Sequence, residues 1–226
     1  MDYQLLEYLQ SFLTERRRTL FDQVLAGRTR HITVAVEDVY QLHNTSAVIR
    51  SCESFGVQDL HVIEEVNAKR IDREIAMGAQ KWVDVHRHTN TASCLKNLKA
   101  NGYKIVATTP HKKAHTLQDF EVGEKAAIFF GRETQGLSDA VLEAADDFIY
   151  IPMVGFTESL NISVSAAITL QHLMSKIKSS EISWQLTDQE LFEKKLDWTR
   201  KMIKDEARIE TRFLADRMEE SKKENN

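Results

Sequence analysis

The sequence predicts an α/β fold, with a mostly parallel sheet and helices on both faces of it. Short segments rich in β-branched residues alternate with amphipathic segments of helical length, and glycines stand at several of the boundaries. This alternation is typical of parallel strands joined by helical crossovers. At 226 residues, the chain is long enough to bury one sizeable core.

The first half of the chain opens with a helix. Residues 2–26 carry apolar side chains at helical spacing, and Gly27 stops the pattern. A β-branched strand, ITVAVE, follows, and the next helix ends at Gly56. Two further strands, DLHVIE and KWVDVH, precede a helix that ends at the Asn101-Gly102 pair. These elements are expected at 32–37, 44–55, 59–64, 81–86 and 91–100.

The second half continues the alternation. The segments YKIVATT, KAAIFFG and DFIYIP predict three more strands, and two helices accompany them, the second of which opens on small residues. These elements are expected at 103–109, 125–131, 138–145, 147–152 and 161–178.

The composition changes to polar and charged after Ser179. Apolar residues at helical spacing predict one long helix over 188–219, and the closing SKKENN is expected to be disordered. The chain therefore divides into a helical arm at 1–30, an α/β domain at 31–178 and a helical extension at 179–226.

Composition excludes several classes of protein. No apolar run approaches the roughly 20 residues that cross a bilayer, and the N-terminus lacks a basic segment followed by an apolar one. The net charge of −4 gives no general sign of nucleic-acid binding, so a basic surface would have to be local. Cys52 and Cys94 have no metal-ligand partners at useful sequence spacing. We expect reduced thiols, no bound metal, a cytoplasmic location, and neither membrane nor DNA as a partner.

The commonest α/β enzymes are also excluded. The chain has no G-x-G-x-x-G loop for a dinucleotide and no G-K-[ST] loop for a nucleotide phosphate. It has no G-x-S-x-G turn for a serine hydrolase and no cluster with zinc spacing.

Three motifs carry the functional signal. They are HNTSAVIRSCESFG at 43–56, FFGRETQGLSDAVL at 129–142 and IPMVGFTESLNISVSAA at 151–167. In this order and spacing, the chain from about residue 30 to 178 resembles the SPOUT-class, trefoil-knotted RNA 2′-O-ribose methyltransferases. The resemblance is to the branch that methylates a guanosine in the D-loop of tRNA.

The resemblance implies a deep trefoil knot in the C-terminal half of the domain, S-adenosylmethionine as cofactor and a homodimer. It also implies methylation of the ribose 2′-OH of guanosine 18 in tRNA. The positions that match cofactor contacts of the family are Thr108, Gly131, Ile151, Met153 and Leu160. Those that match catalytic positions are Asn44, Arg50, Glu133, Ser159 and Asn161.

Physical chemistry sets limits on these roles. An arginine keeps its proton up to a pKa above about 12, so Arg50 fits a phosphate clamp better than a proton acceptor. Arg50 follows Asn44 by six residues, about 600° of helix rotation, so the two side chains do not share one face. Without the motif, Arg50 would be interpreted as a surface residue, and Asn44, Ser159 or Asn161 as a plain helix cap.

RNA binding is inferred from basic residues alone. The candidates are Arg16, Arg17, Arg18, Arg28, Arg30, His43, Lys112, Lys113, Lys176 and Lys178. The third motif is followed by lysines and few arginines, which leaves the identity of the RNA more open than the reaction. Two alternatives therefore stay open: the same reaction on ribosomal RNA, and a knotted RNA-binding protein without catalysis.

Overall fold

The computed structural model describes residues 1–39, 42–65, 78–109, 114–132 and 135–224. The chain forms two compact units. One is Thr29–Gln185, and the other combines Met1–Arg28 with Leu186–Asn226. The sequence-based division at residues 30 and 178 stays a prediction, but it did not anticipate that the two terminal segments belong to one unit.

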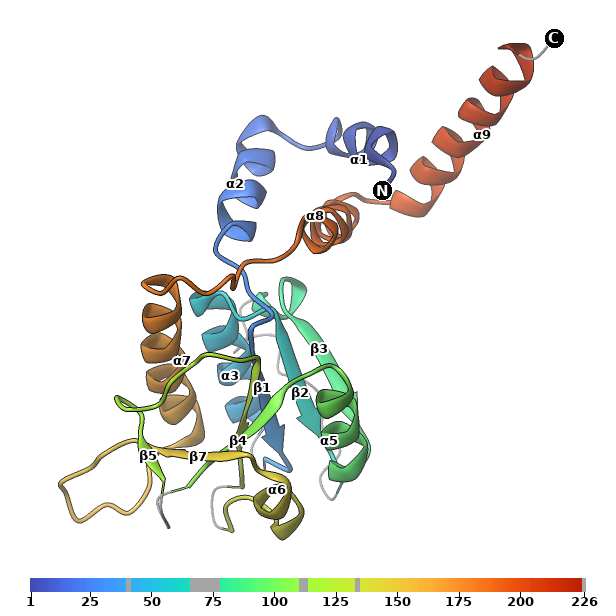
Figure 1. Ribbon diagram of the computed structural model, residues 1–226. Coiled ribbons are helices and arrows are strands. Elements are labelled where there is room, and N and C mark those ends of the chain that lie inside the picture. Colours follow the sequence, from blue (N-terminus) through green and yellow to red (C-terminus); the bar gives the residue numbers. More distant parts are fainter. Residues whose placement is uncertain (40–41, 66–77, 110–113, 133–134, 225–226) are drawn as a thin grey trace. The chain divides into compact units, whose positions relative to one another are not determined.

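The larger unit is built on a seven-stranded sheet of order β3-β2-β1-β6-β4-β7-β5 (Figure 1). All six pairings between neighbouring strands of this sheet are parallel, which confirms the predicted fold class. The strands are β1 (Ile32–Glu37), β2 (Asp59–Ile63), β3 (Asp84–His88), β4 (Lys104–Thr108), β5 (His115–Thr116), β6 (Ala126–Phe130) and β7 (Asp147–Tyr150). The trefoil knot stays a prediction from the resemblance.

Two strands differ from the sequence prediction. The third strand was expected at 81–86 but begins at Asp84. Gly78, with φ of +85°, opens a 3₁₀ turn at Ala79–Lys81 that occupies the predicted start. The short edge strand β5 was not predicted, because two residues carry no recognisable period.

Helices cover both faces of the sheet (Figure 1). Alternate residues of β6 show the two layers: Ile128 and Phe130 belong to one buried apolar cluster, and Ala127 and Phe129 to the other. The first cluster includes residues of α3 (Leu42–Phe55) and α7 (Ile162–Lys178). The second includes residues of α5 (Thr91–Ala100) and α6 (Asp139–Ala144). Burial on both faces explains why the central strands are continuously apolar.

The smaller unit is helical. It contains α1 (Tyr3–Gln10), α2 (Glu15–Leu25), α8 (Asp188–Met202) and α9 (Glu206–Glu224). Both long helices predicted from the sequence were wrong in length. Thr14 caps a new helix inside 2–26, and Asp205, with φ of +58°, interrupts 188–219. Among the described residues, no helix is long and apolar enough to cross a membrane.

Candidate functional site

A cavity of about 470 Å³ lies at the carboxyl ends of β4, β6 and β7. In parallel sheets, this edge is where ligands bind. The cavity is lined by residues from the second and third motifs and from the end of β4. Among them are all five predicted cofactor residues: Thr108, Gly131, Ile151, Met153 and Leu160. Residues more than 50 positions apart in the sequence therefore meet at one hollow.

Gly131 at the end of β6 has no room for a side chain. A Cβ atom there would lie 2.2 Å from the Gly136 carbonyl carbon and 2.3 Å from the Leu137 nitrogen. The loop folds back this closely because Arg132 and Gly136 exchange two backbone hydrogen bonds of 3.0 Å. Gly136 itself has φ of +70°, a conformation that suits glycine. The wall of the cavity thus depends on the glycines of the second motif.

Two buried carboxylates at the end of β1 hold this loop at both ends. Glu37 accepts hydrogen bonds from the Ser138 backbone nitrogen (2.8 Å) and hydroxyl (2.6 Å). It also accepts one from the hydroxyl of Thr91 (2.6 Å), at the start of α5. Asp38 pairs with the guanidinium of Arg132 at 2.8 Å. Sequence analysis missed both acids, although two adjacent acids at the end of a buried strand were a signal.

The first and third motifs meet through two amides. Asn161 Nδ2 donates to Asn44 Oδ1 over 3.2 Å, and Asn44 is only 2% exposed. Asn161 also caps α7, because its Oδ1 accepts from the Ser163 backbone nitrogen at 2.8 Å. Asn44 lies inside α3, so its interpretation as the helix cap was wrong. Ser159 lines the cavity directly.

Arg50 lies elsewhere. It is exposed, and with Ala47, Ser51, Ser54 and Phe55 it lines a separate hollow of about 240 Å³. It is not among the described residues that line the larger cavity. Buried Asn44 and exposed Arg50 confirm that the two side chains leave α3 in different directions. The fifth predicted catalytic residue, Glu133, lies outside the described residues.

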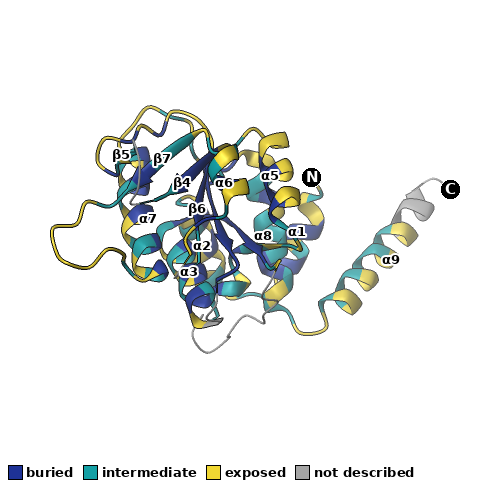
Figure 2. Ribbon diagram, turned by 90° about the horizontal axis from the view of Figure 1, so that it is seen from below, coloured by how far each residue is buried: buried dark blue, intermediate teal, exposed yellow. Residues whose placement is uncertain are grey.

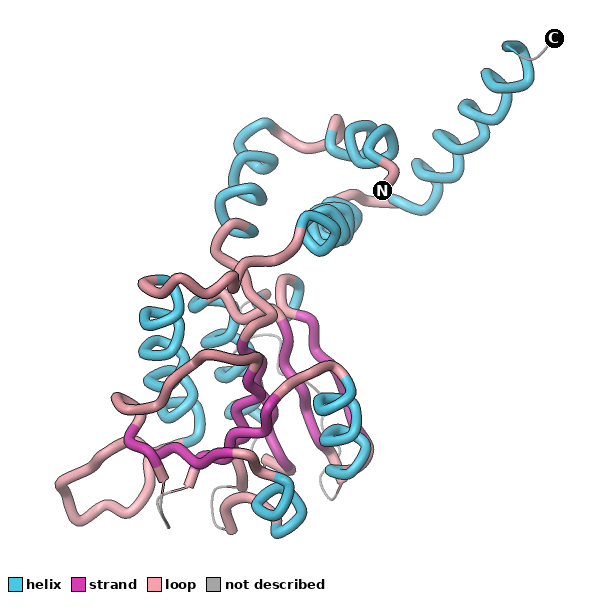
Figure 3. The backbone as a smooth tube through the Cα atoms, in the orientation of Figure 1, coloured by secondary structure: helices cyan, strands magenta, loops and turns pink. Residues whose placement is uncertain are grey.

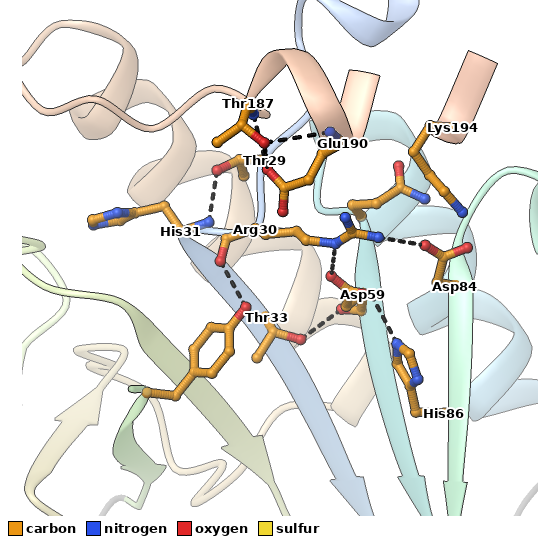
Figure 4. Close-up of polar contacts among 12 residues, drawn as sticks. Thr29, Arg30, His31, Thr33, Asp59, Asp84, His86, Thr187, Glu190 and Lys194 are labelled. Atoms are coloured by element: carbon orange, nitrogen blue, oxygen red, sulfur yellow. Dashed lines mark hydrogen bonds and ion pairs between the residues drawn. The ribbon is translucent and has the colours of Figure 1, made fainter. Parts of the chain in front are cut away.

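Two of the basic residues predicted to bind RNA, Arg28 and Arg30, interact with other side chains of the protein. Arg28 is 1% exposed, and its guanidinium carbon lies 5.4 Å from the centre of the Trp198 ring, within the helical unit. Arg30 donates to Asp59 at 2.8 Å and to Asp84 at 2.9 Å (Figure 4). Burial engages the guanidinium of Arg28 and two carboxylates engage that of Arg30, so we do not count these two among the cations available to RNA.

Neighbouring groups shift the pKa values of Asp59 and His86 beside Arg30. Burial raises the pKa of Asp59, but the hydrogen bond from His86 at 2.8 Å and the charge of Arg30 outweigh it, so the pKa lies below its ordinary value. The same hydrogen bond to Asp59 raises the pKa of His86. This network joins β2 and β3 to the segment before β1, and its residues are not among the described residues that line the cavity (Figure 4).

The other basic residues differ in their availability. Arg16, Arg18, His43 and Lys178 are exposed, and Arg17 is half-buried. Lys176 donates to the carbonyl oxygens of Gln118 (3.2 Å) and Phe120 (2.8 Å) and to the carboxylate of Glu121 (3.1 Å). It therefore contributes little free charge. Lys112 and Lys113 lie outside the described residues.

Comparison with known proteins agrees with this geometry. Residues 31–171 match the model of the SpoU rRNA Methylase family. The tRNA (guanosine(18)-2′-O)-methyltransferase of Borreliella burgdorferi is 37% identical over 202 residues, which cover 89% of this chain and 93% of that protein.

Two solved structures are also similar. The Aquifex aeolicus TrmH/SpoU tRNA modifying enzyme superimposes with a TM-score of 0.75 at 31% identity, over 84% of this chain and 98% of that one. The SpoU methyltransferase AviRb from Streptomyces viridochromogenes, in complex with AdoMet, has a TM-score of 0.61 at 22% identity. It covers 70% of this chain and 65% of its own, and at this identity the likeness concerns the fold.

Proposed function

The chain belongs to the SpoU rRNA methylase family, and from this membership we propose that it methylates the 2′-OH of guanosine 18 in tRNA. The donor is S-adenosylmethionine. The observation that carries the proposal is the cavity at the carboxyl ends of β4, β6 and β7, where the five positions proposed from the family resemblance to bind the cofactor meet. Relatives that are 37% and 34% identical carry the name of this reaction and support the choice of tRNA.

The residues present fit the cofactor. A volume of about 470 Å³ lies within the roughly 300–1,000 Å³ typical of small-molecule sites. Leu117, Phe130 and Ile149 offer apolar surface, and Thr108 and Ser159 offer hydroxyl groups. Gly131 has no side chain, which lets the backbone of residues 136 and 137 pack against it and close the cavity wall. When bound, S-adenosylmethionine supplies an electrophilic methyl carbon on a sulfonium.

The chain then has to align the ribose 2′-hydroxyl with the methyl group and allow the hydroxyl proton to leave. In-line transfer needs the 2′-oxygen held in place, which is a matter of positioning. Arg50 is proposed to hold an RNA phosphate by paired hydrogen bonds, while the hydroxyl proton leaves to phosphate or water. Asn44 and Asn161 would hold the first and third motifs in register, and Ser159 and Glu133 would shape the cavity wall.

We further propose a homodimer. In the segment 151–161, which Figure 3 shows as loop, Val154 and Phe156 are fully exposed. Val164 and Ile168, one turn apart on α7, are also exposed, at 45% and 40%. Figure 2 shows this loop as one of the most exposed parts of the unit. The chain's own Arg50 does not line the cavity, and we propose that a second copy covers this apolar surface and supplies its Arg50 there.

Binding of tRNA is assigned to the exposed cations. Arg16, Arg18, His43 and Lys178 are available to phosphates, together with half-buried Arg17. Lys112 and Lys113 are proposed on sequence alone, and Lys176 only if it leaves its three acceptors. Since its substrate is tRNA, we place the protein in the cytoplasm.

Incubation with labelled S-adenosylmethionine tests the proposal. Unmodified tRNA and ribosomal RNA are supplied separately, and any 2′-O-methyl group is mapped by nuclease-resistant dinucleotides. Label in the tRNA D-loop is expected. Label in ribosomal RNA alone would favour the ribosomal alternative that the family name also suggests. Binding of tRNA without affinity for the cofactor would favour a non-catalytic RNA-binding protein.

A further inference from the structure

Three metal-ligating side chains meet at the side of the sheet away from α3 and α7. They are His61 on β2, His88 on β3 and Cys94 on α5, and their ligand atoms all lie within 4.8 Å of one another. His61 Nδ1 and His88 Nε2 are only 2.9 Å apart. Cys94 and His61 are buried, whereas His88 is partly exposed, so the group opens to solvent on one side.

The register of the strands brings these residues together. His88 pairs with Ile63, and His61 lies two residues before Ile63, so both imidazoles leave the same face of the sheet. Ile63 packs in the apolar cluster that contains Cys94, which places this face beneath α5. The two rings stack at 5.2 Å between centroids.

We propose that His61, His88 and Cys94 bind one zinc ion, with water in the fourth position on the side where His88 is exposed. Two imidazole nitrogens and a thiolate are ligands that Zn²⁺ prefers, and hard cations such as Mg²⁺ and Ca²⁺ do not. Ligands at about 2.0–2.3 Å from a tetrahedral zinc ion lie roughly 3.3–3.6 Å apart. The longest separation, up to 4.8 Å, therefore has to shorten by about 1.2–1.5 Å and the 2.9 Å separation has to lengthen by less than about 1 Å, which side-chain rotations can supply.

Charges of both signs lie near the three side chains, since His86 stacks on His61 and a carboxylate lies on the other side. The carboxylate of Glu37 is completely buried and acts electrostatically on Cys94. When zinc binds, the thiol proton of Cys94 leaves to solvent as the Zn–S bond forms.

The competing interpretation is an apolar core that contains one hydrogen-bonded histidine pair. In that case His61 and His88 share a proton and Cys94 only fills space. The two interpretations differ in one observable. Only a metal site gives the thiolate of Cys94 a bond to the ion, and this bond has an optical signature with cobalt.

The full-length protein, treated with chelator and dialysed, is titrated with Co²⁺. The proposal predicts saturation at one ion per chain, visible ligand-field bands and a near-ultraviolet thiolate-to-cobalt band, all removed by stoichiometric Zn²⁺. Cys94→Ser should lose the thiolate band and His88→Gln should weaken binding at least tenfold. His88 lies on an edge strand and is partly exposed, so this variant is expected to fold even if Cys94→Ser does not.

Two matched controls sharpen the result. Cys52→Ser alters the other buried cysteine, which lies in the opposite apolar cluster, and should keep the thiolate band. His86→Gln alters the histidine that stacks on His61 and should leave cobalt affinity within about threefold, although the protein loses some stability. Absence of a thiolate band in the native protein, or a band that disappears in Cys52→Ser instead, would overturn the proposal. Both outcomes are independent of methyl transfer.

Discussion

Asn161 donates a hydrogen bond from Nδ2 to Oδ1 of Asn44 over 3.2 Å, across 117 positions of sequence. The same side chain caps α7 through its Oδ1. The amide therefore connects the start of α7, where the cavity loop ends, to the buried face of α3. This double use explains why an asparagine suits the position better than an ordinary helix cap.

Asn161→Ala is expected to remove both functions. The lost cap alone lowers the free energy of unfolding by about 1 kcal/mol. Cofactor affinity should fall as well, because the loop 151–161 loses its anchor. Asn161→Asp is the control: it keeps an oxygen for the cap but has no amide to donate to Asn44. Denaturant titration and calorimetry would show a stable but weak-binding Asp variant. Equal cofactor affinity in all three proteins would show that the link to Asn44 is unimportant.

Arg50→Ala should separate chemistry from cofactor binding. Arg50 does not line the cavity, so the cofactor dissociation constant should stay within a few-fold, whereas methyl transfer falls by on the order of 10² or more. Arg50→Lys keeps the charge and loses the paired geometry, and should recover only part of the rate. Arg212, an exposed residue of α9, provides the control substitution to alanine. A near-normal rate for Arg50→Ala would remove this residue from the mechanism.

Gly131→Ala is expected to abolish cofactor binding. The added Cβ would meet backbone atoms of residues 136 and 137 at 2.2–2.5 Å, so the loop must move. Gly123→Ala is the matched control, since nothing lies within 4 Å of a Cβ at that glycine. Calorimetry with S-adenosylmethionine should show no binding for the first variant and native affinity for the second. Retained affinity in Gly131→Ala would mean that this loop does not form the cofactor site.

Two arginines should give opposite results. Arg30 pairs with Asp59 and Asp84, so Arg30→Ala should lower the melting temperature and leave tRNA affinity unchanged. Arg18 is exposed, so Arg18→Ala should leave the melting temperature unchanged, weaken tRNA binding and reduce its dependence on salt. Melting curves and filter binding at several salt concentrations measure both quantities. The reverse pattern would contradict the assignment of RNA contacts by exposure.

The parts of the structure that sequence could predict were those with a period or a motif. The strand ITVAVE and the helix at 91–100 are examples, and the family resemblance pointed to five positions that line one cavity. Helix interruptions at Thr14 and Asp205 could not be predicted, because the apolar spacing continues through them. Nor could the meeting of His61, His88 and Cys94, since strand register and the packing of α5 determine it. The sequence also could not predict which arginines are exposed, since Arg28 is buried and Arg18 is exposed although both lie in basic segments.

The central claim is transfer of a methyl group to one 2′-oxygen, and a tRNA that lacks this oxygen tests it most directly. Synthetic tRNA with 2′-deoxyguanosine at position 18 is compared with tRNA that carries the same change at position 19. We predict that the first accepts no label from S-adenosylmethionine, although it still binds, and that the second is labelled at the native rate. Label in the 18-deoxy tRNA would contradict the account, because the methyl group would then be going to another atom.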